Sequence, residues 1–313
     1  MAMPIRSFSP AYAALRQTGQ ASGRVSAALE RISTGQKINA ARDNPAGLVI
    51  SEMLRSQAGA TAAALQNTRE AGNLLSIAEG GLGSMQENLR QMRSLAVHAL
   101  NTGINSPEQA GADQAVLDSL LQTMQRTAAT TRYAGQNLLD GSRADPAADP
   151  KTAFQASPDG GGMALQRGSG GTAADRERIN LPDASLSGLG RVADGGRAYA
   201  LDDLRAGGGA SLAANPLMAL RVIDQAIADV AEARAGIGAY QANSLETGAD
   251  NLEKELASLV STESYLRDAD IARESTELAQ ARTQMQVGLR VIARANQLSR
   301  QNALSLLEAG GVR

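Results

Sequence analysis

The chain has 313 residues, of which 43% are hydrophobic, 20% are charged and only 2% are aromatic. Its 30 basic and 32 acidic residues leave a formal net charge of −2, so no basic excess points to nucleic acid or to an anionic membrane surface as a partner. Cysteine is absent and histidine occurs once, which excludes a disulfide framework and argues against any metal site.

The N-terminal stretch, MAMPIRSFSPAYAALRQ, lacks the continuous apolar segment and the small-residue cleavage site of a Sec signal peptide. The sequence also contains no run of about 18 apolar residues. We therefore expect neither a Sec signal nor a membrane span.

A first helix is expected over residues 12–32. Its apolar stripe is weak and is interrupted by small residues, which allows a close approach to another helix but buries little area. The stripe consists of Leu15, Val25, Leu29 and Ile32. The segment is therefore expected to be marginal by itself.

The stretch STGQKINAARDNPAG, residues 33–47, interrupts the helical pattern. Gly35 can end a helix in the left-handed conformation, and Pro45 fits the first turn of a new one. Asp43 or Asn44 is expected to cap that new helix. The stretch is interpreted as a joint between two layers of the molecule.

Two further helices are expected, over residues 45–99 and 107–131. The first would be far longer than an ordinary globular helix. Its apolar residues keep a 3-4 spacing, which is typical of a bundle or coiled-coil seam, and we interpret its methionines as core rather than as ligands. The seam residues are Leu82, Met85, Leu89 and Met92.

The composition changes at residues 141–212, which are rich in glycine and proline. Long helices are not expected there, and residues 153–156 and 178–181 are predicted to be the strands of a short hairpin. From residue 216 to about 265 a heptad pattern returns, and this helix is expected to pair antiparallel with the 45–99 helix. The pattern consists of Leu245, Ala249, Leu252, Leu256, Leu259 and Leu266.

A second joint is expected at LRDADIARES, residues 266–275, where Asp268 and Asp270 are interpreted as caps. The last helix is expected over residues 271–307, with a stripe made of Leu278, Met285, Leu289, Ile292, Leu298 and Leu306. The predicted fold is mainly α, an elongated antiparallel bundle of long helices with a small β-hairpin region. Folding at the glycine-rich middle would pair the termini and bring the two joints side by side.

These residues resemble bacterial flagellin, the subunit of the flagellar filament. The N-terminal likeness includes ALERISTGQKINAARDNPAGLVISEML and RYAGQNLLDGS, and the C-terminal likeness includes STESYLRDADIARESTELAQARTQMQ and ANQLSRQNALSLL. Together they cover about residues 20–142 and 214–307. The short middle indicates a small flagellin with a reduced central region.

The resemblance implies three parts of the chain. Residues 1–42 and 270–313 would form a terminal coiled-coil domain at the filament core. Residues 43–190 and 211–269 would form an outer helical bundle with the hairpin, and residues 191–210 a short variable connection. The terminal stripes listed above would be subunit interfaces, because one chain cannot cover them, and the terminal helices would order on assembly.

The resemblance further implies a structural protein of the extracellular flagellum that polymerises with itself for motility. It implies type III export without a Sec signal, an export chaperone at the C-terminal helix, and contacts with the filament cap and the hook–filament junction proteins. Two alternatives are a junction protein of the same family and a non-flagellar coiled-coil adaptor.

A toll-like innate receptor detects flagellins through a helix motif resembling LQRVREL and a glutamate on the next helix. The matching residues are Leu89, Arg90, Gln91, Met92, Arg93, Ser94 and Leu95, with Thr123 near the second-helix position. Gln91, Ser94 and Thr123 replace charged residues of that pattern. We therefore expect weak recognition, since lost charge pairs weaken an interface.

Catalytic readings are disfavoured. His98 has no second histidine or any cysteine to share a metal, and it is expected on a helix surface. Asp268–Asp270 and Asp202–Asp203 lack a nucleophile beside them and are interpreted as cap and turn residues. The glycine runs lack the sequence of a phosphate loop. We expect no enzyme activity, no cofactor and no metal.

Overall fold

The structure is a computed structural model that describes residues 9–101, 106–143, 154–157 and 162–310. The chain divides into two compact units. A terminal unit combines Met1–Ser56 with Ser258–Arg313, and a larger unit comprises Gln57–Ala257. The sequence-predicted domain limits at 42/43 and 269/270 concern the assembled polymer and stay a prediction.

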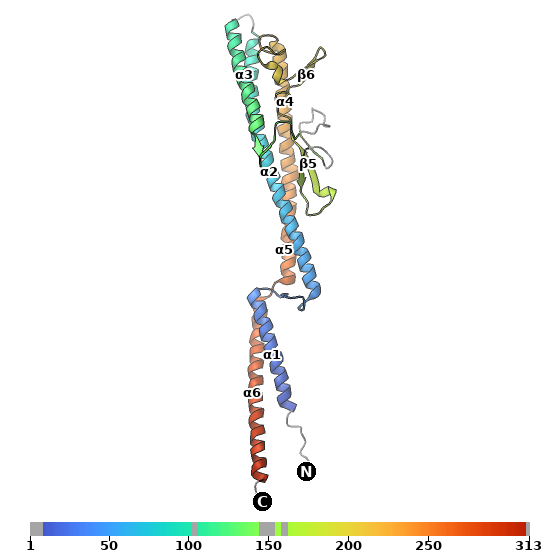
Figure 1. The fold of residues 1–313 in the computed structure, drawn as a ribbon, viewed down its shortest axis with the longest axis vertical. Helices are drawn as coiled ribbons and strands as arrows, with labels where there is room; N and C mark the ends of the chain where they lie inside the picture. The colour runs from blue at the N-terminus through green and yellow to red at the C-terminus, as the bar shows by residue number, and fades with distance from the viewer. Residues whose placement is uncertain (1–8, 102–105, 144–153, 158–161, 311–313) are drawn as a thin grey trace. The chain divides into compact units, whose positions relative to one another are not determined.

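Helices dominate both units, as predicted (Figure 1). The helices are α1 (Ser9–Thr34), α2 (Pro45–Ala99), α3 (Pro107–Thr130), α4 (Pro216–Tyr240), α5 (Thr247–Arg267) and α6 (Ile271–Gly310). The predicted range of 45–99 for α2 is confirmed. No described helix is long and apolar enough to cross a membrane.

Helix ends follow the local chemistry of the sequence. The Asn44 side chain accepts a hydrogen bond from the Gly47 amide at the start of α2, and Asn215 does the same for Met218 at the start of α4. Ser106 and Gln109 form a reciprocal capping box on α3. Each of these helices also begins with proline, whose fixed φ suits the first turn.

In the terminal unit, α1 packs against α6 through small side chains. Ala21 and Ala28 on α1 and Ala281 on α6 are buried. Gly288 permits an especially close approach, because a Cβ added there would lie 2.2 Å from the Thr18 hydroxyl oxygen. The helices thus approach closely and leave their larger apolar side chains at the edges of the seam.

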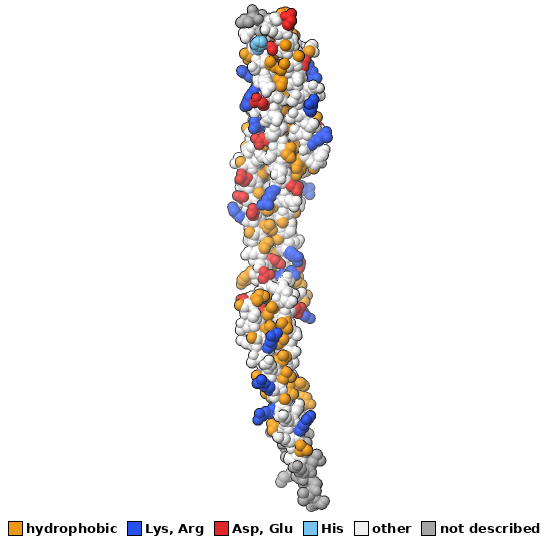
Figure 2. Space-filling model, turned by 90° about the vertical axis from the view of Figure 1, so that its left-hand side faces the viewer, with side chains coloured by type: hydrophobic (Ala, Val, Ile, Leu, Met, Phe, Trp, Pro, Cys, Tyr) orange, Lys and Arg blue, Asp and Glu red, His pale blue; other side chains and the backbone are white. Residues whose placement is uncertain are grey.

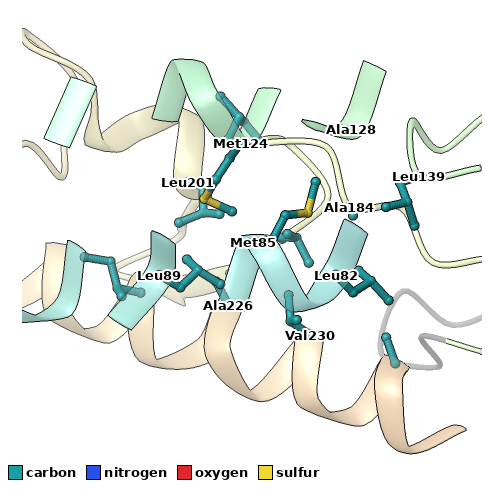
Figure 3. Close-up of a cluster of buried hydrophobic side chains, with 14 of the residues drawn as sticks. Leu82, Met85, Leu89, Met124, Ala128, Leu139, Ala184, Leu201, Ala226 and Val230 are labelled. Atoms are coloured by element: carbon teal, nitrogen blue, oxygen red, sulfur yellow. The ribbon is translucent and has the colours of Figure 1, made fainter. Parts of the chain in front are cut away.

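The larger unit has charged side chains of both signs interspersed on the face in Figure 2. Its core lies between α2, α3 and α4 and is closed by the loop segments around Leu139, Ala184 and Leu201 (Figure 3). The predicted α2 seam of Leu82, Met85, Leu89 and Met92 is fully buried in this core. Core packing is therefore the role of these methionines.

The segment from residue 216 pairs antiparallel with α2, as predicted. Within the larger unit the partners descend in order: Arg93 with Asp224, Glu79 with Arg234, and Arg69 with Glu253. The segment is not one regular helix, however. A π-helical stretch, η4 (Gln241–Glu246), separates α4 from α5.

Short strands lie between α3 and α4, in two hairpins and one three-stranded sheet. They are β1 (Arg132–Tyr133), β2 (Gln136–Asn137), β3 (Gln155–Ser157), β4 (Met163–Gln166), β5 (Arg176–Asn180), β6 (Val192–Asp194) and β7 (Arg197–Tyr199). The predicted pairing is present, since β3 and β5 are antiparallel with Ala156 opposite Ile179. The two-stranded prediction was incomplete, because β4 pairs with the other edge of β5. Residue 153 lies outside the described part of the chain.

Candidate assembly interface

The two predicted joints lie side by side in the terminal unit. The Lys37 amide donates to the Arg267 carbonyl oxygen at 2.6 Å, and the Ala269 amide donates to the Gly35 carbonyl oxygen at 2.8 Å. Gly35 has φ of +70°, the left-handed conformation that ends α1. Backbone pairing therefore fixes the end of α1 against the start of α6.

The Arg267 side chain strengthens this junction. Its guanidinium donates to Gln36 Oε1 at 3.2 Å and to Glu52 Oε1 at 2.7 Å. Only 13% of the Arg267 side chain is exposed, so this ion pair is less screened by water than a surface pair. One side chain thus ties the first joint, the start of α2 and the end of α5 together.

The acidic residues of the joints accept hydrogen bonds from nearby residues of the same chain. Asp270 Oδ1 accepts from the amides of Ala272 and Arg273 at the start of α6, and Asp268 accepts from the Ser264 hydroxyl. Asp43 accepts from the amides of Ala40 and Asn39, and these hydrogen bonds lower the pKa of its carboxyl. The predicted cap is confirmed for Asp270, and Asn44 rather than Asp43 caps α2. Asp268 does not cap α6, because its bond is to the Ser264 hydroxyl at the end of α5.

The predicted interface residues remain incompletely covered. Val25, Ile32, Leu278, Met285 and Ile292 are half-buried along the α1–α6 seam. The others are exposed, by 57% at Leu15, 43% at Leu29, 53% at Leu289 and 54% at Leu298. The side chain of Leu306 lies outside the described residues. Apolar surface on both terminal helices is therefore uncovered within the single chain.

Sequence reasoning missed a second group of exposed apolar side chains in the terminal unit. Val49, Ile50 and Met53, at the start of α2, are 64%, 49% and 60% exposed, and Tyr265 is 86% exposed. Three apolar residues within five positions at the start of a helix were the available signal. These residues extend the uncovered apolar surface beyond α1 and α6.

The segment expected to contact an innate receptor is split by the fold. Leu89 and Met92 are fully buried, whereas Gln91, Arg93 and Thr123 are exposed and Leu95 is half-buried. Arg93 also forms an ion pair of 2.6 Å with Asp224. In the folded chain, only the exposed and half-buried residues of this segment can contact a partner.

The remaining polar candidates have structural partners. His98 is on the surface of α2, with Nδ1 2.6 Å from Asp113 Oδ2 on α3. Asp202 and Asp203 belong to a short 3-10 turn and pair with Arg205 and Arg197. Within the described ranges, no group of three acidic, histidine or cysteine side chains is arranged to hold a metal ion.

Comparison with known proteins gives a consistent result. The sequence model of the bacterial flagellin N-terminal helical region matches residues 5–144, and that of the C-terminal helical region matches residues 220–307. The chain belongs to the bacterial flagellin family. Both joints and all of the exposed apolar residues named above fall within the matched segments.

Full-length relatives are similar along nearly the whole chain. The flagellin of Bacillus subtilis is 32% identical, with 89% of this chain and 91% of the relative aligned. The flagellar filament 30.7 kDa core protein of Treponema maltophilum is 29% identical over 93% and 95%. The flagellin of Halalkalibacterium halodurans is 30% identical over 92% and 94%. The chain is a small flagellin and a structural subunit of the filament, and none of these three relatives favours the junction-protein or adaptor alternative.

Proposed function

We propose that this flagellin polymerises by burying the apolar surface of its terminal unit between copies. The supporting observation is the exposure of Leu15, Leu29, Leu289 and Leu298 on α1 and α6, while the larger unit has a closed core. Burial of such side chains contributes about 25 cal/mol per Å² of apolar area removed from water. Non-closing contacts of one surface with a different surface of the next copy generate helical filaments.

The terminal helices are proposed to order only on assembly. The α1–α6 seam contains alanine, glycine and threonine, so it buries little apolar area within one chain. Fixing the backbone costs about 1–2 kcal/mol per residue, which this seam does not offset alone. Neighbouring copies would supply the missing burial, and the subunit would stay soluble until incorporated.

Seeded growth tests both proposals. Purified chain is added to short filament seeds, and growth is followed by electron microscopy and light scattering. Deleting residues 1–40 or 271–313 should abolish growth while circular dichroism shows that the helices of the larger unit persist. Truncated chains that elongate seeds at the parent rate would contradict the proposal.

We further propose export through the type III apparatus without a Sec signal, and an export chaperone that binds residues 271–307. The exposed Val287, Leu289 and Leu298 on α6 support a partner that covers this helix before assembly. The chaperone should co-purify with the intact chain and not with a chain lacking residues 271–307. Equal recovery with both would count against the assignment. The filament cap and the hook–filament junction proteins are proposed as the partners at the ends of the polymer.

Recognition by a toll-like innate receptor is proposed to be weak. Gln91, Ser94 and Thr123 expose uncharged side chains. Arg93 is charged but forms an ion pair with Asp224. Gln91→Arg with Ser94→Glu should increase activation in a cell reporter assay by restoring charged contacts. Full-strength activation by the unchanged chain would refute the proposal. A catalytic role is not proposed, since flagellins are structural proteins.

A further inference from the structure

Two long stretches near the chain ends carry charge of one sign only. Every charged side chain in residues 1–29 and in residues 278–307 is an arginine. Over the described part of these segments, Arg16 and Arg24 lie on α1, and Arg282, Arg290, Arg294 and Arg300 lie on α6. In Figure 2 the charged side chains toward the end of the terminal unit are basic, whereas acidic ones appear nearer the joints.

These arginines have no acidic partner in the described part of their own chain. All six are exposed, and none forms an ion pair or a side-chain hydrogen bond there. Lysine, aspartate and glutamate are depleted in protein interfaces, whereas arginine is enriched because its planar guanidinium binds carboxylates through two hydrogen bonds. Arginine is the usual basic residue throughout this chain, so the informative feature is the absence of acidic residues, which favours an acidic partner.

One face of α6 combines arginine with apolar residues. Val287, Arg290, Val291, Arg294 and Leu298 follow the 3-4 spacing of a single helix face, and all five are exposed. The opposite face, with Met285, Gly288 and Ile292, lies along the seam with α1. We call the first set of five residues the outer face of α6. It has both the apolar area and the charge expected of a docking surface.

The joint of the same unit provides an acidic counterpart. A hollow of about 700 Å³ is lined there by a carboxylate cluster, by fewer basic groups and by apolar side chains that include Ile38 and Tyr265. The carboxylates are Asp43, Asp268, Asp270, Glu274 and Glu277, and the basic groups are Arg31, Lys37 and Arg273. We call this hollow the joint pocket.

Glu274 is the exceptional member of the joint pocket. Its side chain is 8% exposed, and Oε1 is 3.3 Å from Arg31 Nη1. The second oxygen, Oε2, is buried and has no hydrogen-bond partner among the described residues. A buried carboxylate oxygen without a donor is unfavourable, so positive charge brought to the pocket by another molecule would stabilise the carboxylate electrostatically.

We propose that the outer face of α6 of one copy docks at the joint pocket of a second copy, with Arg290 and Arg294 directed to its carboxylates. This contact rests on the proposed polymerisation and specifies which surfaces meet. The apolar residues between the arginines would cover the Tyr265 ring, which is 86% exposed. A polyanion is the less favoured partner, because the outer face has no aromatic residue to stack with bases.

Charge exchange tests the contact in the full-length chain. The first variant reverses the outer face by Arg290→Glu with Arg294→Glu. The second reverses the pocket by Glu277→Arg with Glu274→Gln, which replaces two negative charges by one positive charge. Each alone should raise the critical concentration for seeded growth about tenfold or more, since like charges would meet. In a chain carrying all four substitutions, the increase in the logarithm of the critical concentration should be at most half of that in either double variant.

Matched controls use exposed charges of the larger unit that have no ion pair in the described residues. Arg126→Glu and Glu255→Arg should leave the critical concentration within about twofold of the parent value. Recovery in the four-substitution chain would support the contact. The proposed contact would be overturned if the four-substitution chain showed the sum of the two separate losses. It would also be overturned if the pocket and outer-face variants grew like the parent. Neither result would argue against polymerisation itself. A parent chain that fails to elongate seeds would overturn the proposed function itself.

Discussion

The Lys37 amide and the Arg267 carbonyl are joined by a hydrogen bond of 2.6 Å, which brings two parts of the chain 230 positions apart into one junction. The Arg267 side chain adds bonds to Gln36 and Glu52 from the same position. In this flagellin the end of α1 and the start of α6 are therefore held at one junction.

Arg267→Leu should weaken the junction. The substitution removes a mostly buried guanidinium and its hydrogen bonds to Gln36 and Glu52. The terminal unit is therefore expected to lose about 1–3 kcal/mol of stability. The readout is the temperature at which filaments depolymerise, followed by light scattering. Arg69→Leu removes a more exposed pair with Glu253 and should change that temperature little. Equal shifts in the two variants would contradict the structural role of Arg267.

Gly288→Ala should separate α1 from α6. The added methyl would lie 2.2 Å from the Thr18 hydroxyl oxygen, and overpacking of this kind costs about 1–3 kcal/mol. Gly59→Ala is the matched control, since its added methyl meets nothing within 4 Å and alanine favours a helix. Filament stability should fall in the first variant and stay level or rise in the second. Thr18→Ala should restore stability when combined with Gly288→Ala, and a failure to do so would exclude this clash as the cause.

Much of this arrangement was predictable from local sequence, because caps and breakers act over a few residues. Gly35, Asn44 and Pro45 marked the first joint, and Asp270 marked the second. The burial of Glu274 was also predictable in principle, because it stands four residues before Leu278 on the α1-facing stripe. Its burial was missed because the stripe was traced through apolar residues alone.

Other features depend on contacts that a helical pattern does not encode. The heptad through residues 245–266 predicted a continuous covered stripe, but Leu245 is buried whereas Leu252 and Leu259 are half-buried. The π-helical stretch lies where Tyr240 bonds Glu177 of β5 and Ser244 accepts from Arg167, and these long-range contacts are not encoded by a local pattern. The seam of α1 and α6 was predicted through Val25, Ile32, Leu278, Met285 and Ile292, whereas its buried alanines and Gly288 were not, because small residues carry little hydrophobic signal.

Tyr240→Phe should loosen the sheet from the end of α4. The Tyr240 hydroxyl donates to Glu177 Oε2 at 2.7 Å, and Arg167 reaches both Glu177 and the Ser244 hydroxyl, at 2.5 and 2.6 Å. Losing the hydroxyl leaves Glu177 with one partner fewer, at an expected cost of about 1–2 kcal/mol of unfolding free energy. Chemical denaturation followed by circular dichroism measures it. Tyr199→Phe, a ring whose contact is with Arg197, is the control.

The same hydroxyl makes stability depend on alkaline pH. Burial and the Glu177 carboxylate raise the pKa of Tyr240 from 10.0 to about 12. Because the folded state holds the proton more tightly, the contribution of the Tyr240 hydroxyl to the free energy of unfolding is complete below pH 10. It is lost as pH rises from 10 toward 12. The loss should be on the order of 1–2 kcal/mol after allowance for solvent screening. Tyr240→Phe should remove this part of the alkaline slope, and an unchanged slope would assign it to other groups.

Core and assembly side chains should respond in opposite ways. Met92 is fully buried between the helices of the larger unit, whereas Leu298 on α6 is 54% exposed. Met92→Ala should lower the unfolding free energy of the monomer by about 2–5 kcal/mol, because it leaves a cavity in a closed core. Leu298→Ser should leave monomer unfolding within about 0.5 kcal/mol of the parent and raise the critical concentration for seeded growth several-fold. Denaturation curves and growth assays on both variants separate the two roles. A Leu298→Ser chain that polymerises like the parent would remove this residue from the assembly interface.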